Sequence, residues 1–384
     1  MMFKILPQEQ TFGLAVFCLV FYFFIYFLLR PAKLYPYSIP KLRYAFTIIL
    51  LLVLSLFYFT VSDWFGYFKE FNEATRGANT HMETIYEWLA FNVTQNYIVW
   101  RLLVWGTALA LLLLTIKRLP VPPALCLLVF VAMMFSRFAY TRTALAYSFM
   151  FFGCVLLYDQ GGGRKALRYI LAFAFIGCSY FFHKSALFGI AMILMALLVK
   201  KIDWKIMVLF LLIAPLLLYL LRNQISNFMM MEFETGEGDF GEYMTIGQTY
   251  MDHKRSGIRG ISGIIHDILL RGPIIAMGVV CLLQGNNDSI PRVIRLFMRV
   301  TVFMVIASLI CRLDLGANTY VMYYRFLNYA GLPAVFSLSY MYCNKIYPRL
   351  LKVIFFVAAL GTFYELTYSA YVRYVNGAVS FGII

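Results

Sequence analysis

Apolar stretches recur about twelve times along this chain, and each is long enough, or nearly so, to cross a bilayer as a helix. With 62% hydrophobic and 13% charged residues, a soluble domain of this length could not cover its surface with polar side chains. We therefore expect an all-α, polytopic integral membrane protein in which residues 1–384 form a single integral membrane domain. The predicted spans lie near residues 12–29, 44–62, 97–116, 119–135, 140–158, 169–183, 185–199, 205–221, 262–283, 298–315, 322–342 and 353–372.

The excess of positive charge lies on one side of this topology. That side comprises the loops 30–43, 117–118, 159–168, 200–205, 284–299 and 343–352. These loops hold 18 of the 33 Lys and Arg residues but only three of the 18 acidic residues, and the rest of the chain is balanced. The positive-inside rule makes this face cytoplasmic, so both termini and the long loops, about 63–96 and 222–261, face outward. Because the basic residues are spread over short loops, they do not indicate nucleic-acid binding.

The outer loop 63–96 has helical periodicity of its own. Apolar residues recur at helical spacing in two runs, first Trp64, Tyr67, Phe68 and Phe71, then Met82, Ile85, Tyr86 and Leu89. This pattern predicts two short amphipathic helices in the outer interface, with their aromatic side chains in lipid. The second outer loop, 222–261, is rich in charged residues and glycine and is predicted to be a charged flap.

Ionisable residues interrupt several spans near their outer ends. They are Arg101, Arg137, Arg142, His183, Arg312, Asp314 and Arg325. A cation in the hydrocarbon region is costly unless it pairs or faces water, so a group of them at one depth indicates a polar site. Snorkelling to lipid headgroups is the alternative for any single one of them. Arginine also suits a membrane-embedded diphosphate site, because its planar fork binds phosphate bidentately and stays charged when partly buried.

Several short motifs follow one another along the chain. They are SDWFGYF at 62–68, HMETIYEWL at 81–89, NYIVWRLLVW at 96–105, YTRTALAYSF at 140–149, FFHKSAL at 181–187 and YYRFLNYAG at 323–331. These motifs lie between about residues 60 and 340. Their order along the chain, and the membrane face on which each is expected, resemble those of the EpsG-like family of Wzy-type bacterial polysaccharide polymerases, which make O-antigen, exopolysaccharide or capsule.

The resemblance implies a glycosyltransferase related to the GT-C architecture in the bacterial cytoplasmic (inner) membrane, with its active site facing the periplasm or exterior. Such enzymes join undecaprenyl-pyrophosphate-linked oligosaccharide repeat units. The expected partners are that lipid-linked oligosaccharide, membrane lipid, and the chain-length regulator and flippase of the same pathway.

This reaction needs a general base for the acceptor hydroxyl and cations for the diphosphate. The candidate bases are Asp63, Glu83, His183 and, next to Glu83 on one helix face, Glu87. A solvated helix face is the alternative for the two glutamates, and a capping or interface role is the alternative for His183. The candidate pyrophosphate- and sugar-binding residues are Arg142, Arg325, Arg101, Arg137, Arg312 and Tyr324. We find no metal-binding motif and no cofactor motif, and we expect metal-independent chemistry.

Two alternative functions stay open for this chain. An O-antigen ligase would use the same lipid-linked donor with a different acceptor, and a twelve-helix transporter or flippase would also carry polar residues in its spans. In the ninth span Asp267 and Arg271 are spaced for an ion pair, and mutual neutralisation is the favoured interpretation. A break in the helix is expected immediately after them, at Gly272 and Pro273.

Overall fold

A computed structural model describes the chain at residues 3–5, 8–31, 37–57, 63–78, 80, 82–135, 141–158, 165–199, 201–217, 220, 261–312, 320–376 and 381–383. The described chain is helical apart from two three-residue strands, β1 (Phe3–Ile5) and β2 (Phe381–Ile383). The predicted flap 222–261 lies, apart from Ile261, outside the described residues.

A helix occupies each of the predicted spans. The helices are α1 (Gln8–Leu28), α2 (Lys41–Phe57), α5 (Tyr97–Arg118), α6 (Pro123–Met133), α8 (Thr141–Tyr158), α9 (Lys165–Phe182), α10 (Ala186–Leu198), Trp204–Leu217, α13 (Ile261–Gln284), α14 (Arg292–Arg312), α15 (Tyr320–Cys343) and α16 (Pro348–Asn376). Their boundaries follow local signals. Asn96 caps α5 by accepting hydrogen bonds from the backbone N–H groups of Ile98 and Val99, and Pro123 occupies the first turn of α6.

Five helices in the described part of the chain are long and apolar enough to cross a membrane. They are Tyr97–Arg118, Lys165–Phe182, Asp267–Gln284, Arg292–Arg312 and Pro348–Thr367. Several shorter apolar helices accompany them. Large apolar side chains on α9, among them Leu167, Ile170 and Phe173, are half or more exposed, which suits contact with lipid and would be unusual for contact with water. The fold is thus that of a helical, multi-pass membrane protein.

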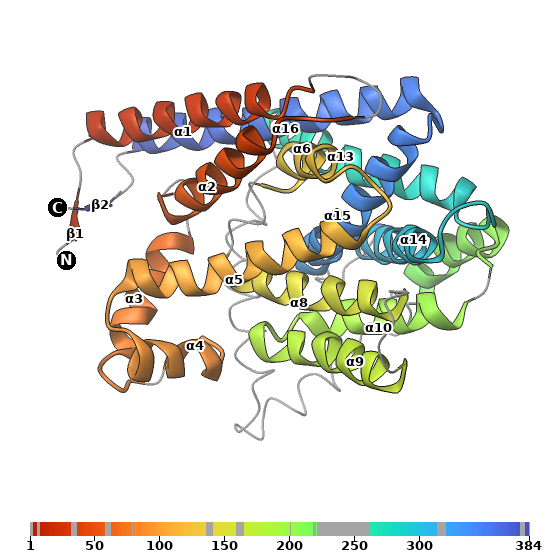
Figure 1. Ribbon diagram of the computed structural model, residues 1–384, viewed down its shortest axis with the longest axis horizontal. Helices are drawn as coiled ribbons and strands as arrows, with labels where there is room; N and C mark the ends of the chain where they lie inside the picture. The colour runs from red at the N-terminus through yellow and green to blue at the C-terminus, as the bar shows by residue number, and fades with distance from the viewer. Residues whose placement is uncertain are drawn as a thin grey trace.

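The two ends of the chain meet. Strands β1 and β2 pair in antiparallel register, with Phe3 opposite Ile383, and α1 packs along α16. Figure 1 shows the paired ends at the same end of the molecule as the helices of the loop 63–96. The two strands and the helices of the loop 63–96 therefore lie toward the same end of the molecule.

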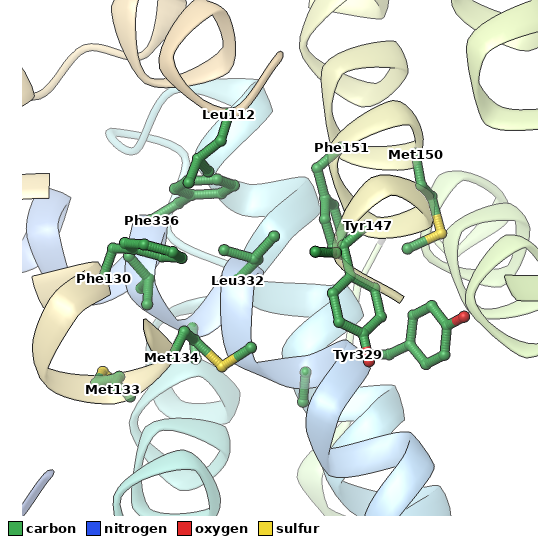
Figure 2. Close-up of a cluster of buried hydrophobic side chains, with 14 of the residues drawn as sticks. Leu112, Phe130, Met133, Met134, Tyr147, Met150, Phe151, Tyr329, Leu332 and Phe336 are labelled. Carbon is green, nitrogen blue, oxygen red and sulfur yellow. The ribbon is translucent and has the colours of Figure 1, made fainter. Parts of the chain in front are cut away.

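The core is built where α14 and α15 pack against α6 and α8. Leu332 and Phe336 on α15 are fully buried beside Phe130 and Met134 from the α6 segment (Figure 2). The expected break at Gly272 and Pro273 was wrong, because α13 continues through Pro273 to Gln284. A proline inside a membrane helix is tolerated when neighbouring helices support the freed backbone, and α13 packs against α14, α15 and α16.

Close approach of α8 to α9 depends on Gly153. A Cβ at this position would lie 2.6 Å from the carbonyl oxygen of Ala172 and 3.1 Å from the backbone nitrogen of Ile176. We expect Gly153→Ala to destabilise the protein by about 1–3 kcal/mol, because backbone atoms cannot move aside as a side chain could. Gly177→Ala on α9 is the matched control, since no atom lies within 4 Å of its added Cβ. Thermal unfolding in detergent compares them, and equal melting temperatures would contradict this close packing.

Candidate active site

The loop 63–96 forms two short helices, as the periodicity predicted. They are α3 (Asp63–Ala74) and α4 (Thr84–Trp88), the latter continued by one π-helical turn, η1 (Leu89–Val93). The expectation that their aromatic side chains lie in lipid was wrong for three of them. Tyr67, Phe71 and Tyr86 are buried within the protein, where Phe71 and Tyr86 contact Trp100 of α5. Periodicity identifies an apolar face, but not what covers it.

Glu83 lies at the N-cap of α4, yet its side chain does not cap the helix. The backbone is extended there, and the carboxylate makes no hydrogen bond to the free N–H groups of α4. The side chain is instead buried, with 7% of the residue exposed. A solvated helix face is therefore excluded for Glu83. The neighbouring Glu87 has a different role, because its Oε1 accepts hydrogen bonds from the backbone N–H and the hydroxyl of Thr80 and so braces the loop.

Arg142, in the first turn of α8, is the ion-pair partner of Glu83. Its Nη1 lies 3.2 Å from Glu83 Oε2 and donates a hydrogen bond to it. The guanidinium carbon is 4.9 Å from the centre of the Tyr67 ring, and the Tyr86 hydroxyl donates to the backbone oxygen of Arg142. These contacts fix the loop 63–96 to the start of α8 and place the carboxylate of Glu83, a candidate base, against the guanidinium of Arg142.

His183 lies in the turn between α9 and α10. The turn is tight, because the backbone N–H of Ala186 donates to the carbonyl of His183 at 2.8 Å. The Nδ1 atom of His183 is 3.8 Å from Glu83 Oε1 and 3.1 Å from the Ser185 hydroxyl oxygen. That hydroxyl is in turn 3.1 Å from the hydroxyl of Tyr329 on α15. Tyr329 packs edge-to-face on Tyr147 of α8, with ring centres 4.5 Å apart (Figure 2).

Glu83 and His183 are the two groups of the site that can take up a proton, and their pKa values are shifted in opposite directions. Burial raises the pKa of Glu83 above its ordinary value, although the positive charges of Arg142 and Lys184 oppose this. Burial, together with the charges of Arg142 and Arg325, lowers the pKa of His183 to about 3. At neutral pH His183 is a neutral imidazole, whereas the raised pKa makes Glu83 a stronger base than an ordinary carboxylate. These opposite shifts make Glu83 a better candidate for the general base than His183.

Of the other predicted arginines, Arg325 lies near His183 and Arg101 is buried beside Tyr97. Arg325 on α15, one turn before Tyr329, is close enough to His183 to lower its pKa. Arg101 on α5 is 2% exposed and donates to the Tyr97 hydroxyl at 3.4 Å, with its guanidinium carbon 5.9 Å from that ring's centre. A buried guanidinium next to a phenol ring is not a snorkelling arginine.

A second group of cations lies where the middle of α13 and the end of α14 meet the start of α15. Asp267 and Arg271 form an ion pair, as predicted, and the guanidinium of Arg271 stacks 3.8 Å from the Tyr324 ring centre. Arg312, which is exposed, lies 5.5 Å from the ring centre of Tyr323. The structure does not bring Arg312 or Tyr324 into contact with Glu83. Arg137 and the side chain of Asp63 lie outside the described residues, although α3 begins at Asp63.

Sequence reasoning missed several residues of the site. Ser185 and Tyr329 are joined to His183 by hydrogen bonds, and Glu70 on α3 interacts electrostatically with both Arg142 and Tyr97. Ser185 and Tyr329 lie within the quoted motifs, but nothing in either motif indicates that they meet. Among the described residues no three His, Cys, Asp or Glu side chains lie close enough to hold a metal ion.

The fold and site together define a class, a multi-pass membrane protein with a buried carboxylate, a guanidinium and an imidazole gathered where α8, α9 and α10 begin or end. A family model matches residues 41–377, and the chain belongs to that family, the EpsG family of Wzy-type polysaccharide polymerase-like proteins. The predicted resemblance is thereby confirmed. Comparison with curated proteins and with solved structures gave no match.

Proposed function

We propose that the protein is a polysaccharide polymerase that joins undecaprenyl-pyrophosphate-linked oligosaccharide repeat units. The observation that carries this proposal is the buried Glu83 carboxylate, paired with Arg142 and facing His183, inside the region matched by a polymerase-like family. A buried, ion-paired carboxylate of raised pKa is suited to take a proton at neutral pH.

In the proposed reaction Glu83 removes the proton from the acceptor sugar hydroxyl. The acceptor oxygen bonds to the anomeric carbon of the donor chain, and the bond from that carbon to the diphosphate oxygen breaks. The electron pair leaves with the lipid diphosphate, whose charge Arg142 and Arg325 stabilise. Neutral His183 provides a hydrogen-bonding group beside the base and adds no charge.

The orientation of the site is part of the same proposal. The charge distribution supports a position of the loop 63–96 on the outer face of the cytoplasmic membrane, opposite the basic loops. Glu83, Arg142 and His183 then all lie at outer ends of helices, where lipid-linked repeat units would be accessible. A GT-C-related architecture and chemistry without a metal ion belong to the same proposal.

Purified protein in proteoliposomes, supplied with lipid-linked repeat units from a strain that lacks the protein, tests this proposal. We expect a ladder of extended chains and release of undecaprenyl diphosphate, in buffer that contains EDTA. Transfer of one unit to a different acceptor, with no ladder on the lipid carrier, would identify a ligase. Movement of the labelled unit across the bilayer without a new glycosidic bond would identify a transporter, and dependence on added Mg²⁺ would contradict metal-independent chemistry.

A further inference from the structure

An apolar face of α4 and η1 is exposed, although these short helices lie next to the candidate site. Trp88, Phe91 and Val93 are each half or more exposed, whereas Tyr86 on the same segment is fully buried. Contact with water would leave two aromatic rings and a valine in a solvent that disfavours them. The depth of the segment in the molecule shows what covers this face.

The turn between α9 and α10 lies below the far boundary of the membrane. Helix α10 has 13 residues and rises about 20 Å, whereas the hydrocarbon core is about 30 Å thick. It ends at the face of the basic loops, where the Val199 carbonyl accepts a hydrogen bond from Arg299. The first turn of α9, with Lys165 and Arg168, belongs to the same face, and the rest of that helix rises about 21 Å. The turn 183–185 is therefore about 10 Å short of the opposite boundary.

Helix α5, by contrast, reaches that boundary. Its 22 residues rise about 33 Å from the basic end at Lys117 and Arg118. Trp100, at the end of the first turn of α5, donates from Nε1 to the Tyr86 carbonyl at 3.3 Å, and the two ring centres are 5.8 Å apart. Tyr86 is thus level with the first turn of a helix long enough to span the membrane, and α4 runs beside that turn.

The surfaces next to this segment are apolar as well. Val99, Leu102 and Leu103 near the start of α5 are about two-fifths exposed, and Phe181 at the end of α9 is 65% exposed. Helix α4 packs against α9, and η1 packs against α5. Figure 1 shows α4 just beyond the end of α9. The exposed face of α4 and η1 therefore lies next to two helices whose exposed side chains suit contact with lipid.

Polar groups of the segment have partners inside the loop 63–96. The Asn92 side-chain amide donates to the carbonyl of Trp88 at 3.1 Å. Glu87, the one charged residue of α4 and η1, accepts hydrogen bonds from the backbone N–H and the hydroxyl of Thr80. These bonds reduce the cost of placing the segment in lipid, where polar groups cannot turn to water.

We propose that α4 and η1 form a re-entrant segment, which dips into the outer leaflet and presents Trp88, Phe91 and Val93 to lipid acyl chains. Acyl chains are the occupant that fits the depth of the segment, its low charge and its apolar neighbours. Glu83, at the start of α4, then lies within the leaflet, and a lipid-linked substrate reaches Arg142 from the side. Insertion of the segment does not depend on the reaction that the site catalyses.

A photoreactive benzophenone amino acid in place of Phe91 tests the proposal in proteoliposomes of the purified protein. Irradiation is expected to give an adduct of protein and phospholipid, which mass spectrometry detects, because benzophenone inserts into C–H bonds within its reach. Lys69 is the matched control position. It lies in the same loop, and its side chain is 68% exposed in an ion pair with Glu73, so we expect no phospholipid adduct there.

Fluorescence gives a second measurement, which needs only a conservative variant. Lipids brominated on their acyl chains are expected to quench the emission of Trp88, and iodide in the water is not. Trp88→Phe should therefore lower the emission that brominated lipids quench. Trp105→Phe, which replaces a fully buried ring on α5, should leave that emission nearly unchanged.

The outcomes separate the re-entrant segment from the proposed function. Equal adduct yields from the Phe91 and Lys69 positions would overturn the re-entrant segment, as would quenching of Trp88 by iodide and not by brominated lipid. A crosslinked dimer in place of the lipid adduct would show that a second copy of the chain covers this face, and would also overturn it. A protein that extends no chain in the extension assay would overturn the proposed function and leave the segment standing.

Discussion

Replacing Glu83 by Gln is expected to lower the rate of chain extension by about 10²- to 10⁴-fold, the usual contribution of a general base. The amide keeps the shape and a hydrogen-bond acceptor for Arg142, but it cannot take a proton at neutral pH. In the wild-type protein kcat should fall as the pH falls through the raised pKa of Glu83, since the carboxylate is then protonated. The measurement is extension rate against pH in proteoliposomes.

Glu87→Gln is the matched control for this prediction. It makes the same chemical change four residues away, at a side chain that braces Thr80 and does not contact Arg142. We expect nearly normal extension from this variant. If Glu83→Gln protein, present in the membrane at the normal level, extends chains as fast as Glu87→Gln protein, Glu83 is not the base, and Asp63 becomes the next candidate.

Replacing Arg142 by Lys is expected to lower the extension rate by about 10- to 100-fold even though the charge is retained. A lysine supplies a point charge but not the planar fork, so it cannot bond to Glu83 and to the donor diphosphate together. The loss of one charge-assisted hydrogen bond, worth roughly 1.5–3 kcal/mol, corresponds to that factor. Arg325→Lys should behave in the same way, and initial rates at saturating donor measure both.

Arg118→Lys is the control for the two arginine variants. Arg118 lies at the opposite end of α5 from the site, where it is exposed and contacts the ring of Phe152, and lysine can occupy the same interface. If Arg142→Lys and Arg325→Lys proteins extend chains as well as Arg118→Lys protein, bidentate binding of the diphosphate is not their function. Arg101 and Arg312 would then be tested next, together with Arg137.

The helices could be predicted from the sequence because length and apolar composition determine them almost locally. Each predicted span coincides with a helix, and even the short helices α3 and α4 follow from apolar residues at helical spacing. What covers each apolar face depends on the rest of the fold. For this reason Tyr67 and Tyr86 were expected in lipid but are buried against the protein, and Pro273 was expected to end a helix that neighbouring helices support.

Three charged residues of the candidate site could be predicted from the sequence, but Glu70 and the neutral residues could not. Arg142 and His183 are identifiable because an ionisable residue near the end of a membrane span is costly unless it has a partner or a function, and Glu83 because it lies in a motif that resembles the family. The structure brings the three together. Ser185 and Tyr329 carry no such signal, since hydroxyl groups are common in membrane helices and bond to their own backbone. They meet through a contact between residues 144 positions apart, which no local pattern contains.

The hydrogen bond between Ser185 and Tyr329 also has a consequence for the order in which the site is assembled during synthesis. Glu83, Arg142 and His183 all emerge from the ribosome in the first half of the chain, whereas α15 follows well over a hundred residues later. A nascent chain that has inserted α10 therefore holds the ion pair but lacks Arg325 and the hydroxyl that completes the histidine turn. The centre becomes complete only when α15 docks, so incomplete chains carry an unfinished site.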